Sequence, residues 1–373
     1  MALIATCIAL ALSLAVIRPL PLSWRGRLPL HLLAWTIAFK FQVVRWLGGP
    51  IPFAPRLPAW IVLPAGWLFA IALFLALAAI ALLPLRLVLF HARPGLLPPR
   101  RLHQLHLAAL CLAIFAASLG LFLGRRPPRI HRLELAFPNL PQEAEGMTIA
   151  LLTDLHADGI TGPREIGRMV RLANALQPDL ILLGGDLVDG TVEMRMGDMA
   201  PLKELSAPLG VWAVPGNHEY YSGFPQWRNA FPQLGIRLLV NEHTTLPQGI
   251  VLAGLSEKVA RKYGEEPPRF EKALAGVPED AFVVMAAHNP NLAPLAAQHK
   301  IPLLLCGHTH GGMVWGMDLL VRKMNKGFLT GLYVAPPETQ VVVSNGAGIW
   351  NGFPLRIGHP SEIPLITLKR KER

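Results

Sequence analysis

The stretch LLTDLHADG, Leu151 to Gly159, is an apolar run that ends in an aspartate and a histidine. Side chains two positions apart on an extended chain point to the same side, so Asp154 and His156 could bind one metal ion together. A strand followed by a capped turn would give the same pattern. The stretch alone leaves both interpretations open.

A Pro-rich segment, RRPPR, precedes this run at residues 125–129. Eight further runs rich in Leu, Ile and Val follow it. Their apolar residues do not alternate with polar ones, which is typical of strands buried on both faces. A helix that opens at Pro163 and ends before Pro178 is predicted between the first two strands. We therefore predict an α/β layered domain. The nine predicted strands are 148–153, 180–185, 211–214, 237–240, 250–253, 281–287, 303–306, 340–344 and 363–368.

Polar residues that can bind metals follow five of these strands. In α/β sheets, ligand sites form outside the carboxyl ends of the strands, so we expect these side chains to meet in one place. One such residue would be an ordinary turn residue, but five separate occurrences indicate a site. The residues are Asp154 and His156 in LLTDLH, Asp186 in LLGGD, Asn217 and His218 in AVPGNHE, His288 in MAAH, and His308 and His310 in LLCGHTH.

The series Asp-x-His, Gly-Asp, Gly-Asn-His-Glu, His and Gly-His-x-His resembles the calcineurin-like metallophosphoesterase superfamily over about Gly146 to Thr367. This resemblance implies a four-layer αββα sandwich that holds two divalent ions, and the donor types suit Mn, Fe or Zn. By resemblance, Asp186 bridges the ions. Asp154, His156 and His310 then complete one ion's shell, and Asn217, His288 and His308 complete the other's.

The same resemblance makes His218 the group that stabilises the phosphoryl charge or protonates the leaving oxygen. Asp189 matches a position that can orient this imidazole, although a turn aspartate would fit the pattern equally well. Glu219 is expected to support the site.

The first third of the chain has a different composition from the rest. Met1 to Arg132 contains 14 of the 35 Lys and Arg and none of the 24 Asp and Glu, and the mean hydropathy of the whole chain is +0.39. These cations lie between apolar runs, as in membrane loops, rather than on a folded polar surface, so we expect no nucleic-acid partner. Three scattered cysteines do not form a disulfide framework.

Four apolar stretches, 1–17, 28–47, 59–83 and 102–123, approach or exceed the length of a transmembrane helix. Lys40 and Arg45 interrupt the second, so they would extend to the lipid headgroups or the segment would lie in the membrane interface. We predict an N-terminal bundle of about four transmembrane helices at 1–124, a linker and lead-in strand at 125–145, and a metallophosphoesterase domain at 146–373.

The arginines predict the orientation in a bacterial inner or plasma membrane. Those at 18, 25, 27, 86, 93, 100 and 101 follow the first and third stretches, whereas only Arg56 follows the second. This bias favours an extracytoplasmic catalytic domain. Four arginines at 125, 126, 129 and 132 oppose it, and losing the second span would invert the orientation.

We predict a membrane-anchored dimetal phosphohydrolase that cleaves a phosphoester or pyrophosphate bond, by attack of a metal-activated hydroxide on a phosphorylated, lipid-linked substrate. The arrangement is similar to a membrane-anchored branch that includes UDP-2,3-diacylglucosamine hydrolases. The apolar and basic segment Gly311 to Phe328 would rest in lipid headgroups or pack as an ordinary loop. One alternative is a structural or sensory metal-binding domain without turnover. A transporter is disfavoured because the apolar stretches contain no Asp or Glu.

Overall fold

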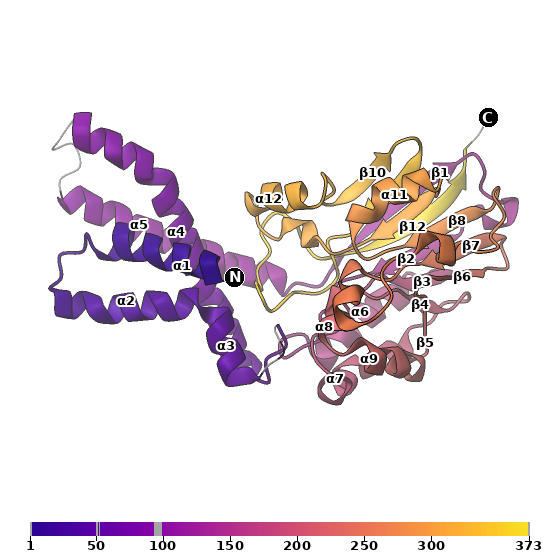
Figure 1. Ribbon diagram of the computed structural model, residues 1–373, viewed down its shortest axis with the longest axis horizontal. Coiled ribbons are helices and arrows are strands. Elements are labelled where there is room, and N and C mark those ends of the chain that lie inside the picture. Colours follow the sequence, from indigo (N-terminus) through magenta and orange to yellow (C-terminus); the bar gives the residue numbers. More distant parts are fainter. Residues whose placement is uncertain (1, 50, 52, 93–98, 372–373) are drawn as a thin grey trace. The chain divides into compact units, whose positions relative to one another are not determined.

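A computed structural model describes residues 2–49, 51, 53–92 and 99–371 of the chain (Figure 1). The chain divides into two compact units. The first comprises Met1–Leu123 together with Asn351–Leu355, and the second comprises Gly124–Trp350 and Arg356–Arg373.

The first unit is helical. Two of its helices contain segments long and apolar enough to cross a membrane, Ala59–Pro84 and His103–Gly124, and they coincide with the third and fourth predicted spans. The segment Ala2–Ile17 is apolar but shorter. The helices are α1 (Ala2–Ala11), a π-helical continuation (Leu12–Ile17), α2 (Trp24–Ala38), α3 (Lys40–Gly48), α4 (Ala59–Ala92) and α5 (Pro99–Gly124).

The predicted bundle of about four spans is not confirmed, because the second stretch is divided at Phe39 into α2 and α3. Lys40 does not extend to a headgroup layer. Its side chain is buried and donates a hydrogen bond of 2.9 Å to the carbonyl oxygen of Gly352. The orientation prediction depends on the number of spans, so it stays a prediction. Arg93, which that prediction used, lies outside the described residues.

The second unit contains two six-stranded sheets, each with a parallel centre. The first has the order β1-β12-β2-β3-β4-β5, in which β2 to β5 run parallel, and the second has the order β10-β11-β9-β8-β7-β6, in which β11, β9, β8 and β7 run parallel. The strands are β1 (Arg129–Phe137), β2 (Thr148–Leu152), β3 (Leu180–Leu183), β4 (Val211–Ala213), β5 (Ile236–Leu238), β6 (Glu242–Thr245), β7 (Ile250–Gly254), β8 (Phe282–Ala286), β9 (Leu303–Cys306), β10 (Gly331–Ala335), β11 (Thr339–Val343) and β12 (Glu362–Arg370).

The two sheets pack face to face, and helices cover their outer faces (Figure 1). Strand β2 shows why the predicted runs lack alternation. Ile149 and Leu151 enter the core between the sheets, whereas Ala150 and Leu152 face the helices, so both sides are buried. The outer helices are α6 (Pro163–Ala175), α7 (Val192–Met199) and α9 (Phe224–Ala230) on the first sheet, and α10 (Phe270–Ala273) and α11 (Ala293–Gln298) on the second.

All nine predicted strands are present, and the mixed α/β layered architecture is confirmed. The lead-in strand is β1, which pairs in parallel with β12. Two strands were not predicted. Strand β6 has the polar sequence EHTT, so it shows no apolar run. Strand β10 has the short apolar sequence GLYVA, which was not identified as a strand from the sequence, and it is half exposed. The domain boundaries at 124/125 and 145/146 stay predictions.

Candidate metal centre

Five loops bring the predicted site residues together. Three of them follow the parallel strands β2, β3 and β4 of the first sheet, and two follow β8 and β9 of the second. The two sets converge, since His288 Nε2 after β8 lies 4.0 Å from Asp154 Oδ1 after β2. The loops thus bring the ends of both sheets to one place.

Several of these residues have a backbone conformation that is rare outside glycine. Asp154, His156, Asp186, His308 and His310 have φ angles of 54°, 48°, 52°, 75° and 51°. Left-handed backbone in a residue with a Cβ costs roughly 1–2 kcal/mol, and such residues concentrate at functional sites, where the surrounding packing enforces them. Short apolar strands that end in sharp turns therefore deliver the polar side chains at a cost in backbone free energy.

One group of potential ligands consists of Asp154, His156 and His310. His156 Nε2 lies 3.1 Å from His310 Nε2, and His310 Nε2 lies 3.4 Å from Asp154 Oδ1. Burial lowers the pKa of His310 well below its usual value, and the neighbouring His156 and Arg356 lower it further. The His310 ring is therefore neutral, which is the form of imidazole that binds metals.

A second group consists of Asp186, His288 and His308. His288 Nε2 lies 3.1 Å from Asp186 Oδ2 and 3.3 Å from His308 Nδ1. His288 Nδ1 donates to the carbonyl oxygen of Gly184, 2.8 Å away, so its Nε2 faces the group. Burial alone would lower the pKa of His288, but Asp186 and Asp154 outweigh burial and raise the pKa to about 10, so a cation bound here would displace the Nε2 proton. Asn217 lies at the start of α8 (Asn217–Tyr221), and its Oδ1 is buried without a hydrogen-bond partner among the described residues.

The donor set fits divalent metal ions. Ring nitrogens that face each other at hydrogen-bonding distance, together with carboxylates and an orphaned amide oxygen, form an arrangement that a cation would stabilise. Imidazole, carboxylate and amide donors suit Mn, Fe or Zn better than metals that prefer thiolates. All seven predicted ligands lie on the converging loops, and their individual metal-binding roles stay predictions.

Asp189 lies between two imidazoles. Its Oδ2 is 3.0 Å from His156 Nδ1, and its Oδ1 is in close contact with His218 Nδ1. Burial alone would raise the pKa of Asp189, but His218 and His156 outweigh it and lower the pKa to about 2. Asp189 is thus an ionised acceptor for both rings rather than a plain turn aspartate.

His218 points its other nitrogen at the metal-ligand groups. Its Nε2 lies 3.9 Å from Asp186 Oδ2. Burial alone would lower the pKa of His218, but the charges of Asp189 and Asp186 outweigh burial and raise the pKa to about 9. At neutral pH the ring is therefore protonated and can donate from Nε2 toward the site.

Glu219 and Gly216 fix the position of Asp186. The carboxylate of Glu219 is fully buried and accepts hydrogen bonds from the backbone N–H groups of Asp186, Gly216 and Leu187 at 3.0, 2.6 and 2.6 Å. A Cβ on Gly216 would lie 2.2 Å from Asp186 Oδ1, so only glycine permits this close approach. The expected supporting role of Glu219 thus has a concrete form, which is to tie together the loops after β3 and β4.

Arg356 supports the site and was not predicted. It is 2% exposed and donates hydrogen bonds to the carbonyl oxygens of His310, His359, Asn345 and Gly348 at 3.1, 3.3, 2.7 and 2.9 Å. The sequence around it, FPLRIG, follows none of the strands and resembles no metal motif. Because its partners are backbone carbonyls, no residue type in the sequence could have indicated them.

The sequence is similar to a family model and to several known proteins. The family model described as calcineurin-like phosphoesterase matches residues 147–312. A protein of Helicobacter pylori named "Uncharacterized metallophosphoesterase" is 36% identical over 270 residues, which cover 71% of each chain. A Danio rerio protein named "Transmembrane protein with metallophosphoesterase domain" is 33% identical over 273 residues, or 70% of this chain and 62% of that one. The solved structure of a 5'-nucleotidase precursor from Thermus thermophilus matches with a TM-score of 0.37 and 15% identity, over 59% of this chain and 54% of that one.

Proposed function

This chain belongs to the calcineurin-like phosphoesterase family, and from that premise we propose that it is a membrane-anchored phosphohydrolase that uses two divalent ions. It would cleave a phosphoester or pyrophosphate bond of a lipid-linked substrate. One observation carries the proposal: loops of two sheets bring six ligand-type side chains together beside a protonated His218, with Asn217 directly before it in the chain.

The ligands divide into two sets around Asp186, which would lie between the ions. Asp154, His156 and His310 would hold one ion, and Asn217, His288 and His308 would hold the other. Two such ions, when bound, activate a hydroxide and neutralise charge on the phosphoryl group.

Asp189 and His218 would position and donate the proton that the reaction needs. Asp189 accepts from Nδ1 of both His156 and His218, so it fixes both rings with Nε2 directed inward. His218 Nε2–H then donates its proton to the leaving oxygen as the bond to phosphorus breaks. Because His218, Asp186 and Asp189 are buried, little water competes for these hydrogen bonds.

Helix α12 (Met317–Met324) supports a lipid-linked substrate. It begins a few residues after His310, and its neighbourhood exposes four apolar side chains together with two cations of its last turn. The exposed fractions of Trp315, Leu319, Leu320 and Met324 are 69%, 71%, 61% and 69%. An apolar face bordered by Arg and Lys suits the boundary between headgroups and acyl chains.

The hydrolytic part of the proposal is tested with the purified full chain, added Mn and bis(p-nitrophenyl) phosphate. We expect Asp186→Asn to abolish release of p-nitrophenol, because the bridging carboxylate is lost. Asp198→Asn is the matched control, since it makes the same change in a partly exposed ion pair with Arg195 on α7. Equal rates in wild type and Asp186→Asn would leave the alternative, a metal-binding domain without turnover.

The lipid part is tested with Leu319→Glu. We expect it to slow hydrolysis of phosphatidic acid in vesicles but not of soluble bis(p-nitrophenyl) phosphate, because only the vesicle substrate requires contact with a bilayer. Leu332→Glu, at an exposed leucine of β10, is the control. Parallel losses on both substrates would argue against a membrane contact through α12.

Membrane anchoring is supported by the two apolar segments and by relatives named as transmembrane proteins. The extracytoplasmic placement of the catalytic domain is a separate part of the proposal. Protease added to intact cells should digest residues 124–371 if that placement is right. Digestion only after permeabilisation would show a cytoplasmic domain.

A further inference from the structure

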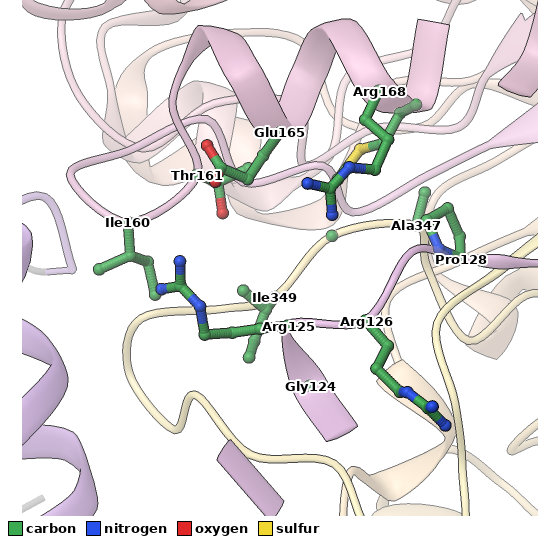
Figure 2. Close-up of a pocket in the computed structure, with 12 residues that line it drawn as sticks. Gly124, Arg125, Arg126, Pro128, Ile160, Thr161, Glu165, Arg168, Ala347 and Ile349 are labelled. Carbon is green, nitrogen blue, oxygen red and sulfur yellow. The ribbon is translucent and has the colours of Figure 1, made fainter. Parts of the chain in front are cut away.

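The second unit has a cavity that none of the seven predicted metal ligands line. Its volume is about 270 Å³, and all of its lining residues belong to the second unit. Three segments form its walls: the chain at Gly124–Pro128, the residues from Ile160 to the first turns of α6, and the loop Ala347–Ile349 (Figure 2).

A buried hydroxyl in this cavity has no partner. Thr161 is 1% exposed, and its Oγ1 makes no hydrogen bond to any described residue. Its backbone is fixed, because Thr161 N–H donates to Asp158 Oδ1 at 2.7 Å and Asp158 N–H donates back to the Thr161 carbonyl at 3.1 Å. A buried polar group without a partner is costly, so its position on a rigid turn points to a ligand that would satisfy it.

Two cations face the same space. The side chains of Arg125 and Arg168 extend toward the space that Thr161 and Glu165 also face, whereas Arg126 points away (Figure 2). Within the described part of the chain, neither Arg125 nor Arg168 forms an ion pair or a hydrogen bond. Glu165 Oε2 already accepts from the Gly162 N–H at 3.2 Å. The cavity thus offers two cations against one carboxylate that is in use.

The start of α6 adds to this field. Its 13 residues begin at Pro163, so the positive end of the helix dipole lies beside Thr161 and Glu165. Arginine binds phosphate oxygens through paired, charge-assisted hydrogen bonds, and a threonine hydroxyl can donate to a third oxygen.

We propose that this cavity binds the phosphate of an anionic ligand, with Arg125 and Arg168 as the charged contacts and Thr161 Oγ1 as a hydrogen-bond donor. A phospholipid headgroup and a free phosphate compound share this chemistry. A lipid headgroup is a candidate ligand because Arg125 is next in sequence to Gly124, the last residue of the second candidate span. The site does not depend on the proposed hydrolytic activity.

One wall of the cavity is joined to the metal centre. Ala347 N–H donates to the carbonyl oxygen of Thr153 at 2.9 Å, and Gly348 N–H donates to that of Asp154 at 3.1 Å. The loop Ala347–Ile349, which lines the cavity, is therefore hydrogen-bonded to Thr153 and to the predicted metal ligand Asp154. Binding in the cavity would hold this loop against β2.

The test uses the full-length chain in neutral detergent with metals removed by EDTA, so that phosphate bound at the metal centre does not contribute. Inorganic phosphate and dihexanoyl-phosphatidylglycerol are titrated separately by calorimetry. The variants are Arg168→Gln, Arg125→Gln and Thr161→Val. Arg171→Gln is the matched control, because it removes an exposed charge from the same helix outside the cavity.

We expect the dissociation constant to rise about tenfold or more in each arginine variant and several-fold in Thr161→Val, with Arg171→Gln within about twofold of wild type. The melting temperature of Thr161→Val should not fall, which separates lost binding from lost folding. Binding of both probes would identify phosphate itself as the ligand group, and binding of the lipid alone would identify a headgroup in its lipid context. If neither probe binds wild type, or if Arg168→Gln binds as tightly as Arg171→Gln, the proposal is wrong.

Discussion

Replacing Asp189 by asparagine tests the arrangement of the two imidazoles most directly. In the wild type one carboxylate accepts from Nδ1 of both His156 and His218. An asparagine has one accepting oxygen, so its amide group must face one of the two rings as a donor. If that ring is His156, its proton moves to Nε2 and the inward-facing lone pair is lost. If it is His218, Nδ1 gives up its proton, so the ring keeps Nε2–H but loses the positive charge that makes it an acid.

The size of the effect follows from the one bond that is lost. A hydrogen bond to a charged group contributes about 1.5–3 kcal/mol. At 1.36 kcal/mol per factor of ten, kcat/KM should fall roughly 10- to 150-fold on bis(p-nitrophenyl) phosphate. Part of this loss should be recovered at high Mn if His156 is the ring affected, and none if it is His218.

The pH profile gives a second measurement. Asp189 raises the pKa of His218, so its removal lowers that pKa, and the protonated acid is lost at a lower pH. The alkaline limb of the rate profile should therefore move to lower pH. Asp198→Asn, which makes the same change away from the two rings, should move neither rate nor profile. A rate for Asp189→Asn within twofold of wild type would refute the proposed role.

Three further predictions concern stability. Gly216→Ala should lower the free energy of unfolding by about 1–3 kcal/mol or more, because its Cβ would lie 2.2 Å from Asp186 Oδ1. Gly197→Ala is the control, since a Cβ at this position inside α7 would have no atom within 4 Å, and it should be neutral or stabilising by about 0.5–1 kcal/mol. Denaturant titration compares the two variants. Arg356→Lys should lower the free energy of unfolding by about 2–3 kcal/mol, since an ammonium cannot reproduce the planar guanidinium that donates to four carbonyl oxygens. A calorimetric melting temperature equal to wild type would contradict this. Chelation should lower the melting temperature, because an ion at 100 times its dissociation constant adds about 2.7 kcal/mol to the folded state; an unchanged melting curve in EDTA would mean that no ion is bound tightly.

The sequence was sufficient to predict that these side chains lie close together, because its signals are local. Each ligand type follows directly after an apolar run, and the carboxyl ends of parallel strands lie on one side of a sheet. Grouping the runs into two sheets needed the family resemblance, since strands buried on both faces look alike in sequence. The positive φ angles of Asp154 and His156 could not be predicted from the sequence either, because neither residue is glycine.

The remaining differences arise from contacts between residues far apart in the chain. An apolar stretch with Lys40 in it favours a helix end in the headgroups, yet this lysine is buried against the carbonyl oxygen of Gly352, 312 positions away. Arg356 likewise depends on the carbonyl oxygens of four separate residues. Hydropathy and periodicity contain no information about such partners.

The position of β12 has a consequence for how the protein is made. Strand β12, Glu362–Arg370, lies between β1 and β2, so β1 pairs with a segment that the ribosome adds more than two hundred residues later. The pairing that joins β1 to β2 through β12 therefore forms only after β12 has been synthesised. Until then the edge of β1 stays unpaired. A premature stop before Glu362 would remove β12 and leave both β1 and the facing edge of β2 without a partner strand.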